Sequence, residues 1–328
     1  MLITDTVDYG GCAAKFGMGE LHRYLASIKT HEHSSDRVGL SALDDAAVIK
    51  FDDKSDLCAT IDFITPIVPD PYIYGQIAAA NSVSDIYAMG GTPRFSLLIA
   101  CLDPRISDDA TYVAMFQGAF DKAEEAGAPI VGGHTILNSG IKLGLSVTGA
   151  QTEAPWVHAN ACVGDRIYLT KPIGTGLYSN AVKQNLTAFS PGDPEIQSMV
   201  TLNDQAVRIA RNARARCVTD ITGFGLLGHL SNISRASSVR IDLFGAAVPT
   251  FGETRSYYEA GMSTSGAGRN RSALTGKVEF DGCPEWLIGI LLDPQTSGGL
   301  AILTSEDLPG MEPIGRVVEG SPGITVNY

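Results

Sequence analysis

Paired cysteines, long apolar stretches and positive charge are all scarce in this sequence. The six cysteines lie far apart with no C-x-x-C pair, which excludes the usual zinc-ligand spacing and a disulfide-dense framework. Lysine and arginine number 24 against 36 aspartate and glutamate residues, for a formal net charge of −12. A chain this acidic is not expected to be a general binder of nucleic acids or of anionic membranes.

No segment suits a membrane or an export signal. The longest apolar stretches, at residues 97–102 and 286–292, are far shorter than the roughly 20 residues that a membrane-spanning helix needs. Residues 1–11 lack the basic segment and apolar core of a signal peptide. Together with the unpaired cysteines, these features predict a soluble protein of a reducing, cytoplasmic compartment.

Three common motifs are also missing. There is no G-x-x-x-x-G-K-[ST], which excludes a P-loop, and no convincing G-x-G-x-x-G at a strand–helix junction, which argues against a Rossmann dehydrogenase. The absence of G-x-S-x-G argues against an α/β-hydrolase. A phosphate ligand is still compatible with the acidic composition, because aspartates can hold Mg²⁺ and the metal then holds the phosphate.

The composition and the order of predicted elements indicate two α/β or α+β domains. With 328 residues, of which 44% are apolar and 18% charged, the chain can bury a large core. We expect a glycine-rich segment at 1–20, an N-terminal domain at 21–155 and a C-terminal domain at 156–328. The expected strands are 46–51, 57–64, 94–102, 129–131 (buried), 141–150, 166–170, 239–243 and 300–303, and the expected helices are 21–29, 72–89, 109–126, 177–183 and 194–213.

Cys12 and Lys15 lie three residues apart on a segment rich in glycine. A nearby ammonium group favours the thiolate form of a cysteine, and glycines let a loop close over a ligand. The pair is therefore a candidate for an activated nucleophile. On these residues alone, an idle or buried cysteine beside a surface lysine is the simpler interpretation.

Several aspartates occur in apolar surroundings. Asp44 and Asp45 precede a predicted strand, Asp62 interrupts another, Asp85 lies in a helix of small and apolar residues, and Asp220 opens a glycine-rich turn. A buried carboxylate is costly unless it is paired, hydrogen-bonded or bound to a metal. One such residue is usually a cap or a turn, but the set favours a shared Mg²⁺ site, and Mg²⁺ normally arrives with phosphates.

Two glycine-rich turns complete the candidates. Gly132, Gly133, His134 and Thr135 follow an apolar strand, so their backbone amides can face a phosphate. His134 is a candidate base or ligand, and a structural histidine explains it equally well. Residues 293–300 form a polar, glycine-ended turn before a strand, for which a structural role is the simpler interpretation.

Segments along almost the whole chain resemble those of the selenophosphate synthetase (selenide, water dikinase) family. They occur in the family's order, and the set is specific although each segment alone is weak. The segments are Cys12-x-x-Lys15 and residues 44–48 (DDAAV), 62–68 (DFITPIV), 84–91 (SDIYAMGG), 132–134 (GGH), 219–229 (TDITGFGLLGH) and 293–300 (DPQTSGGL).

The resemblance implies a two-domain fold like that of aminoimidazole ribonucleotide synthetase. Its N-terminal strands would form a barrel across a homodimer, and ATP and Mg²⁺ would lie between this domain and a C-terminal α+β domain. The implied reaction is ATP + selenide + water → selenophosphate + AMP + phosphate, which supplies activated selenium for selenocysteine and selenouridine synthesis. A selenium-delivery protein is a candidate partner, whereas no nucleic acid or membrane is expected.

The same resemblance implies roles for individual residues. Cys12 is the selenium-handling nucleophile, and Lys15 contacts the ATP phosphates and supports the chemistry. The implied Mg²⁺ ligands are Asp45, Asp85 and Asp220. The implied contacts to ATP or its metal-bound phosphates are Lys15, Ala42, Leu43, Asp44, Asp62, Asp85, Gly133, His134 and Thr135.

The chain departs from the family pattern at Ala42, Ile61 and Ala267, where the family leads us to expect hydroxyl residues. Each change removes one potential hydrogen bond, worth on the order of 1 kcal/mol. Two alternatives to the dikinase are another ATP-dependent enzyme of the superfamily, acting on a ribonucleotide amidine or thiamine phosphate, and a catalytically silent ATP-binding paralogue. The Cys12–Lys15 pair favours the dikinase over both.

Overall fold

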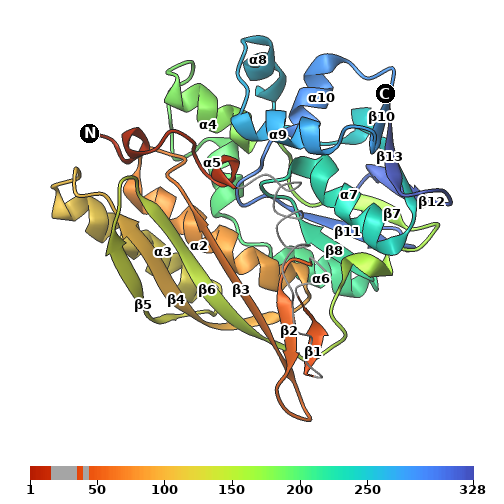
Figure 1. Cartoon of the computed structure of the whole chain (residues 1–328), viewed down its shortest axis with the longest axis horizontal. Helices are drawn as coiled ribbons and strands as arrows, with labels where there is room; N and C mark the ends of the chain where they lie inside the picture. The colour runs from red at the N-terminus through yellow and green to blue at the C-terminus, as the bar shows by residue number, and fades with distance from the viewer. Residues whose placement is uncertain (16–34, 40–43) are drawn as a thin grey trace.

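Two β-sheets organise the chain in the computed structural model, which describes residues 1–15, 35–39 and 44–328. The first sheet lies at the lower left of Figure 1, and the second lies at the right. The prediction of a mixed α/β fold is confirmed. The helix expected at 21–29 lies outside the described residues.

The first sheet has six strands in the order β1–β2–β3–β6–β4–β5. Neighbouring strands are antiparallel, except that β4 and β5 are parallel. Because side chains alternate between the two faces of a strand, each strand contributes to both faces of the sheet. The strands are β1 (Asp36–Val38), β2 (Ala47–Lys50), β3 (Asp56–Ile64), β4 (Thr92–Leu102), β5 (Ile130–Leu137) and β6 (Lys142–Gln151).

Helices α2 (Pro71–Ala88) and α3 (Asp109–Glu125) cover one face of this sheet (Figure 1). The two helices approach closely where Gly75 and Gly118 lack a side chain. A Cβ atom on Gly118 would overlap the carbonyl oxygen of Tyr72. The close contact therefore depends on glycine at this position.

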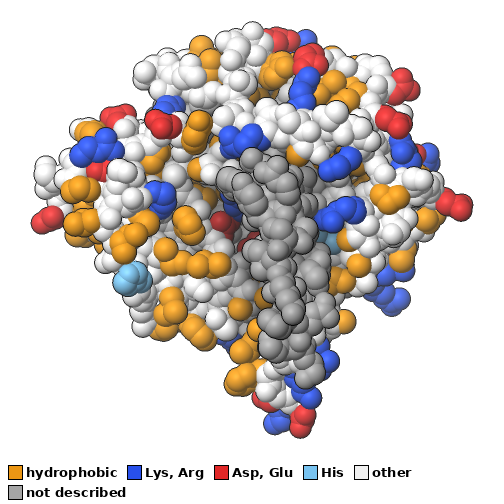
Figure 2. All heavy atoms as spheres, in the orientation of Figure 1, with side chains coloured by type: hydrophobic (Ala, Val, Ile, Leu, Met, Phe, Trp, Pro, Cys, Tyr) orange, Lys and Arg blue, Asp and Glu red, His pale blue; other side chains and the backbone are white. Residues whose placement is uncertain are grey.

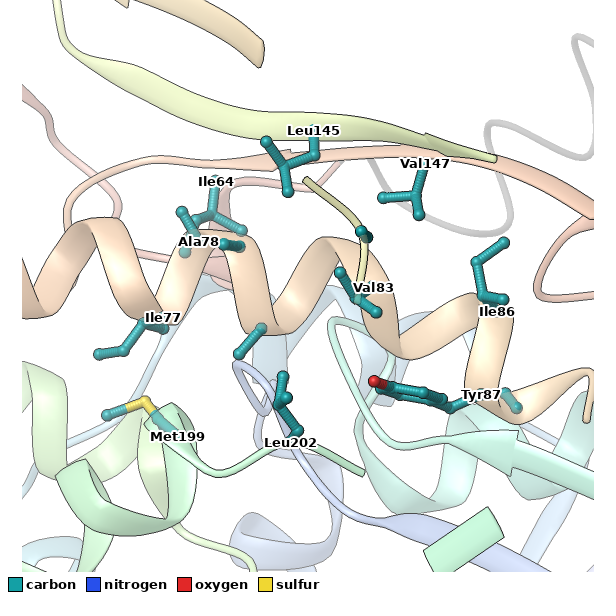
Figure 3. Packing of buried hydrophobic residues seen from close by; sticks show 14 of the residues in the cluster. Ile64, Ile77, Ala78, Val83, Ile86, Tyr87, Leu145, Val147, Met199 and Leu202 are labelled. Atoms are coloured by element: carbon teal, nitrogen blue, oxygen red, sulfur yellow. The ribbon is translucent and has the colours of Figure 1, made fainter. Parts of the chain in front are cut away.

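Helix α2 is packed on opposite sides by both halves of the chain. Figure 3 shows Ile64, Leu145 and Val147 of β3 and β6 on one side of it, and Met199 and Leu202 on the other. These residues belong to one continuous apolar cluster. The position of α2 is therefore fixed relative to both sheets.

In the part of the chain that the structure describes, no helix covers the opposite face of the first sheet. It exposes the apolar side chains of Ile49, Ile61, Phe63, Phe95 and Leu97, and apolar side chains gather over this sheet in Figure 2. The edge strand β5 is half-buried at its first residue and exposed along the rest. The expectation of a buried strand at 129–131 is therefore wrong, because an apolar run does not reveal that its strand lies at a sheet edge.

The second sheet has seven strands in the order β10–β13–β9–β12–β7–β11–β8. The strands are β7 (Arg166–Leu169), β8 (Cys217–Asp220), β9 (Arg240–Phe244), β10 (Val278–Asp281), β11 (Leu300–Thr304), β12 (Gly315–Val318) and β13 (Gly323–Asn327). The helices of this half are α4 (Thr175–Lys183), α5 (Pro194–Val200), α6 (Asp204–Asn212), α7 (Gly225–Ser237), α8 (Thr254–Glu259), α9 (Ser265–Ala273) and α10 (Glu285–Leu292). Within the described part of the chain, no helix has the length and apolar character to cross a membrane.

One predicted helix differs from the structure. The helix expected at 194–213 is divided into α5 and α6, because tertiary contacts hold the residues between them: Asn203 Nδ2 donates a hydrogen bond to Ser84 Oγ (2.9 Å), and Lys171 Nζ donates to Thr201 O (2.6 Å). The other expected elements that lie within the described residues, apart from the strand at 129–131, agree within two residues at each end.

Candidate active site

A short 3-10 turn at Cys12–Ala14 connects the two halves of the chain. Gly11 precedes it with a φ of 58°, a left-handed conformation that favours glycine. The N–H of Gly11 donates to Thr65 O (3.1 Å), and the N–H of Cys12 donates to Thr296 Oγ1 (3.0 Å). The turn is thus held by the N-terminal half on one side and by the C-terminal half on the other.

The thiol of Cys12 faces α2. Its Sγ donates to Asn81 Oδ1 (3.4 Å), and the residue is only 1% exposed. Burial raises the pKa of Cys12 to about 12, and the opposing effect of the Lys15 ammonium is smaller. Lys15 favours the thiolate, as expected, but burial outweighs this effect, so the thiol is neutral near pH 7.

The ammonium group of Lys15 is paired with Asp62. Lys15 Nζ donates to Asp62 Oδ2 (3.0 Å), and Asn81 Nδ2 donates to the same oxygen (2.7 Å). Burial favours the neutral amine, but the negative groups around it, Asp62 above all, together outweigh this effect and raise the pKa of Lys15 above its usual range. The Lys15 side chain is 33% exposed, so its charge remains accessible to a ligand.

Asp45, Asp220 and His229 form a cluster that fits a metal ion. Each offers one ligand atom, and the three atoms lie within 4.8 Å of one another. Among the described residues, Asp220 Oδ2 is buried without a hydrogen-bond partner, and Asp45 Oδ2 has none closer than the ring of His158, whose Nε2 lies 3.5 Å away. Burial, followed by the charge of Asp45, raises the pKa of Asp220 to about 7. Crowded carboxylates with unpartnered oxygens suit a divalent cation.

Asp85 faces the same region from α2. Its Oδ2 accepts a hydrogen bond from Thr60 Oγ1 (2.5 Å) on β3. Burial raises the pKa of Asp85 well above its usual range, and Asp220, Asp62 and Asp45 each raise it further. Asp45, Asp85 and Asp220 therefore lie close enough to interact electrostatically.

Asp44 is hydrogen-bonded by His158, a residue that no sequence motif indicated. Asp44 Oδ1 accepts from the N–H of His158 (2.6 Å), and the buried ring of His158 lies between two carboxylates: Nδ1 is 3.5 Å from Asp44 Oδ1, and Nε2 is 3.5 Å from Asp45 Oδ2. Burial favours the neutral ring, but Asp45 and Asp44 outweigh it and raise the pKa of His158. His158 thus holds both carboxylates at the start of β2.

His229 is a neutral donor in this arrangement. The N–H of Thr222 donates to His229 Nε2 (3.1 Å), so the ring proton is assigned to Nδ1, which lies 3.5 Å from Thr219 Oγ1. Thr219 Oγ1 in turn donates to Asp45 Oδ1 (3.0 Å). Burial lowers the pKa of His229 to about 3. With Nδ1 protonated and Nε2 accepting from Thr222, His229 has no lone pair left for a metal ion, and it orients Asp45 through Thr219 instead.

The turn at 293–300 has the expected structural character and also contacts the site. Thr296 holds the N–H of Cys12, and the N–H of Ser297 donates to Asn81 Oδ1 (2.9 Å). Ser297 has a φ of 49°, which a non-glycine residue rarely adopts. Sequence reasoning missed Asn81, although it is a buried polar residue in the same apolar helix as Asp85.

The remaining predicted nucleotide contacts are not brought together with these groups. Gly133, His134 and Thr135 lie on the exposed edge strand β5. Strands β6 and β4 separate it from β3, which corresponds to about 14 Å at the usual strand spacing. Ala42 and Leu43 lie outside the described residues.

Comparison with known proteins defines the class. Family models of AIR synthase related proteins match residues 43–151 (N-terminal domain) and 163–327 (C-terminal domain). Solved structures with the same fold include thiamine monophosphate kinase from Aquifex aeolicus (19% identity, TM-score 0.65, 94% of each chain covered) and hydrogenase maturation protein HypE in complex with ATP (19% identity, TM-score 0.59, 94% of this chain and 90% of that chain). The fold and both domains are those of an AIR synthase related protein.

Relatives with higher sequence identity to this chain define its family within that class. Selenide, water dikinase from Desulfitobacterium hafniense (strain Y51) is 38% identical over 314 residues, which cover 95% of this chain and 92% of that protein. The selenide, water dikinase from Clostridioides difficile (strain 630) is 40% identical over 309 residues, 93% and 88% of the two chains. The chain therefore belongs to the selenide, water dikinase family.

Proposed function

We propose that this chain is a selenophosphate synthetase that converts ATP, selenide and water to selenophosphate, AMP and phosphate. Relatives at 38–40% identity that carry the name selenide, water dikinase support the assignment. The observation that carries it is a hydrogen-bonded chain of side chains: Cys12 Sγ to Asn81 (3.4 Å), Asn81 to Asp62 (2.7 Å) and Lys15 to Asp62 (3.0 Å). A nucleophilic sulfur and a fixed positive charge thus share one site.

The carboxylates beside this chain of residues fit Mg²⁺. Asp45, Asp85 and Asp220 would hold the ion, and the buried Asp220 Oδ2, which has no hydrogen-bond partner among the described residues, supports this choice. Bound Mg²⁺ would neutralise charge on the ATP phosphates as phosphoryl groups are transferred. A chain with a formal net charge of −12 needs such compensation to hold a polyanion.

Each protein group then has a definite task. Lys15 presents its ammonium to phosphate oxygens, where a fixed charge stabilises the transition state. Asn81 Oδ1 holds the Cys12 proton and orients Sγ. Because the thiol is neutral and buried, this proton must leave before Cys12 can act as a thiolate.

We infer that the uncovered face of the first sheet pairs with a second copy of the chain. Its exposed apolar side chains would leave water in a homodimer, and strands of the two copies would close a barrel. In this arrangement Gly133, His134 and Thr135 can contact ATP held by the carboxylates of the other copy. Light scattering should give the mass of a dimer, and a charged residue at Phe63 should shift it toward the monomer.

Three further expectations remain predictions. They are the division into 1–20, 21–155 and 156–328, a cytoplasmic location and a selenium-delivery protein as partner. All six cysteines are free in the structure, which suits a reducing compartment and a reaction that needs the Cys12 thiol.

Phosphorus NMR under anaerobic, reducing conditions tests the reaction. With Mg²⁺ and ATP, we expect AMP, phosphate and selenophosphate only when selenide is present. Cys12→Ser should abolish selenophosphate formation and leave Mg·ATP binding, while Cys162→Ser, at an exposed thiol, should change neither. Equal ATP consumption with and without selenide would indicate a different acceptor, and ATP binding without turnover would indicate a silent paralogue.

A further inference from the structure

Arg269 on α9 contacts the backbone of the turn that carries Cys12. Its Nη2 donates to Ala13 O (2.5 Å) and to Lys15 O (3.4 Å). Its guanidinium carbon lies 5.9 Å from the ring centroid of Tyr9, within the range of a cation–π contact. Among the described residues, no other group donates a hydrogen bond to either carbonyl oxygen.

The turn itself has few hydrogen bonds of its own, so contacts from the rest of the chain fix its position. It has three residues, Cys12–Ala14, with no side-chain cap, and 3-10 turns of this length have poor hydrogen-bond geometry. Ala13 lies between the thiol and Lys15 in sequence. A movement of the Ala13 carbonyl would therefore displace both functional groups.

Arg269, by contrast, extends from a well-anchored helix. Thr264 caps α9 and donates to the buried Asp293 (3.1 Å). Asn270, the next residue along α9, is buried and donates to Leu292 O (2.9 Å). The helix can therefore serve as a fixed support for the turn.

We propose that Arg269 is a positioning residue that holds the Cys12–Lys15 turn in place through the carbonyl oxygens of Ala13 and Lys15. Its role in catalysis rests on the proposed function, because the turn matters to the reaction only if Cys12 and Lys15 take part in it. Lysine is a poor substitute, since a single ammonium lacks the planar fork that reaches two acceptors and stacks on a ring.

Arg269→Met and Arg269→Lys test this role, with Arg271→Met as a matched control. Arg271 lies on the same helix and pairs with Glu285 at the surface. The first measurement is the rate at which iodoacetamide modifies Cys12, followed by peptide mass spectrometry with the exposed Cys162 as internal reference. The second is kcat and the KM for ATP in the selenide-dependent reaction, and thermal unfolding checks each variant.

In Arg269→Met, we expect iodoacetamide to modify Cys12 about tenfold faster than in the unaltered chain. The kcat should fall roughly 100-fold, and the KM for ATP should stay within about threefold of its original value. Arg269→Lys should be intermediate, and it decides the question if the methionine variant does not fold. Arg271→Met should match the unaltered chain. Thiol rates in the Arg269 variants equal to those of Arg271→Met would overturn the proposal. This measurement needs no turnover, so absence of selenide-dependent AMP formation in the unaltered chain would count against the proposed function instead.

Discussion

The burial of Cys12 predicts that its thiol reacts slowly with an alkylating agent. The residue is 1% exposed, its Sγ donates to Asn81, and burial raises its pKa to about 12. Alkylation proceeds through the thiolate. The rate should therefore follow the small fraction of Cys12 that is ionised at the pH of the assay.

The size of the effect follows from this pKa. At pH 8, a pKa of about 12 leaves roughly one Cys12 thiol in 10,000 ionised, against about a quarter of an ordinary cysteine with a pKa near 8.5, a difference of about 2,000-fold. A thiolate of higher pKa is the stronger nucleophile, which recovers roughly 30- to 50-fold. Cys12 should thus react at least about 50-fold more slowly than a free thiol, before any steric hindrance.

A time course of iodoacetamide modification from pH 7 to 9.5 measures this rate, with N-acetylcysteine as the free thiol. The Cys12 rate should rise about tenfold per pH unit without levelling off. Lys15→Met should slow it further, because Lys15 lowers this pKa. A rate that levels off near pH 8 would refute the reasoning, since it would mean that Lys15 outweighs burial and activates the thiol before a ligand binds.

Three other substitutions, at Asp220, Lys171 and Gly118, should change the stability of the folded chain by different physical causes. Asp220→Asn should weaken Mg²⁺ binding more than about tenfold in calorimetric titration. It should also stabilise the metal-free chain by roughly 1 kcal/mol above pH 7, because it removes a buried charge and the repulsion of that charge with Asp45. Burial lowers the pKa of Lys171 to about 7 in the folded chain, whereas a lysine of the unfolded chain has a pKa near 10.4. The free energy of unfolding therefore rises with pH between these two values. In urea unfolding, the stability lost in Lys171→Met should be about 2 kcal/mol larger at pH 9 than at pH 7. Gly118→Ala should destabilise by roughly 2–3 kcal/mol because its methyl group overlaps a backbone carbonyl of α2, while Gly268→Ala, which adds a methyl in open space on α9, should be neutral or stabilising.

Each of these expectations can fail clearly. Unchanged Mg²⁺ affinity in Asp220→Asn would remove that residue from the metal site. A stability difference for Lys171→Met that is the same at pH 7 and pH 9 would mean that this amine does not titrate in the window. Equal stabilities of Gly118→Ala and Gly268→Ala would show that the helices separate at little cost.

The aspartates that the sequence indicated for the site share one property, a charged side chain beside or inside an apolar segment. Asp62, Asp85 and Asp220 all have this signal, because burying a carboxylate is unfavourable unless another group compensates. The same criterion applied to the whole of α2 also selects Asn81. His158 has no such signal, since it lies in an irregular connection where polar residues are common, and only the fold brings it between Asp44 and Asp45.

The limits of the fold prediction are equally physical. Strands β3, β4 and β6 and helices α2 and α3 are long enough to show a clear period and were placed within two residues, whereas the short strands β8, β10 and β12 were not predicted. The break between α5 and α6 depends on contacts with residues far away in the chain. The exposure of β5 depends on its place at the sheet edge, which local sequence does not encode.

Helix α2 explains how groups from distant parts of the chain meet. Its polar residues contact different surroundings: Asn81 bonds to Cys12 and Asp62, Ser82 to Asp62 O and the N–H of Leu145, Ser84 to Asn203, and Asp85 to Thr60. At about 100° per residue these four positions span an arc of roughly 160°, and because Asn81, Ser82 and Ser84 are buried, that arc is not a polar face for solvent. Because one rigid helix carries both the partner of the thiol and a candidate metal ligand, the spacing between sulfur and carboxylates is set by the packing of α2 between the two sheets.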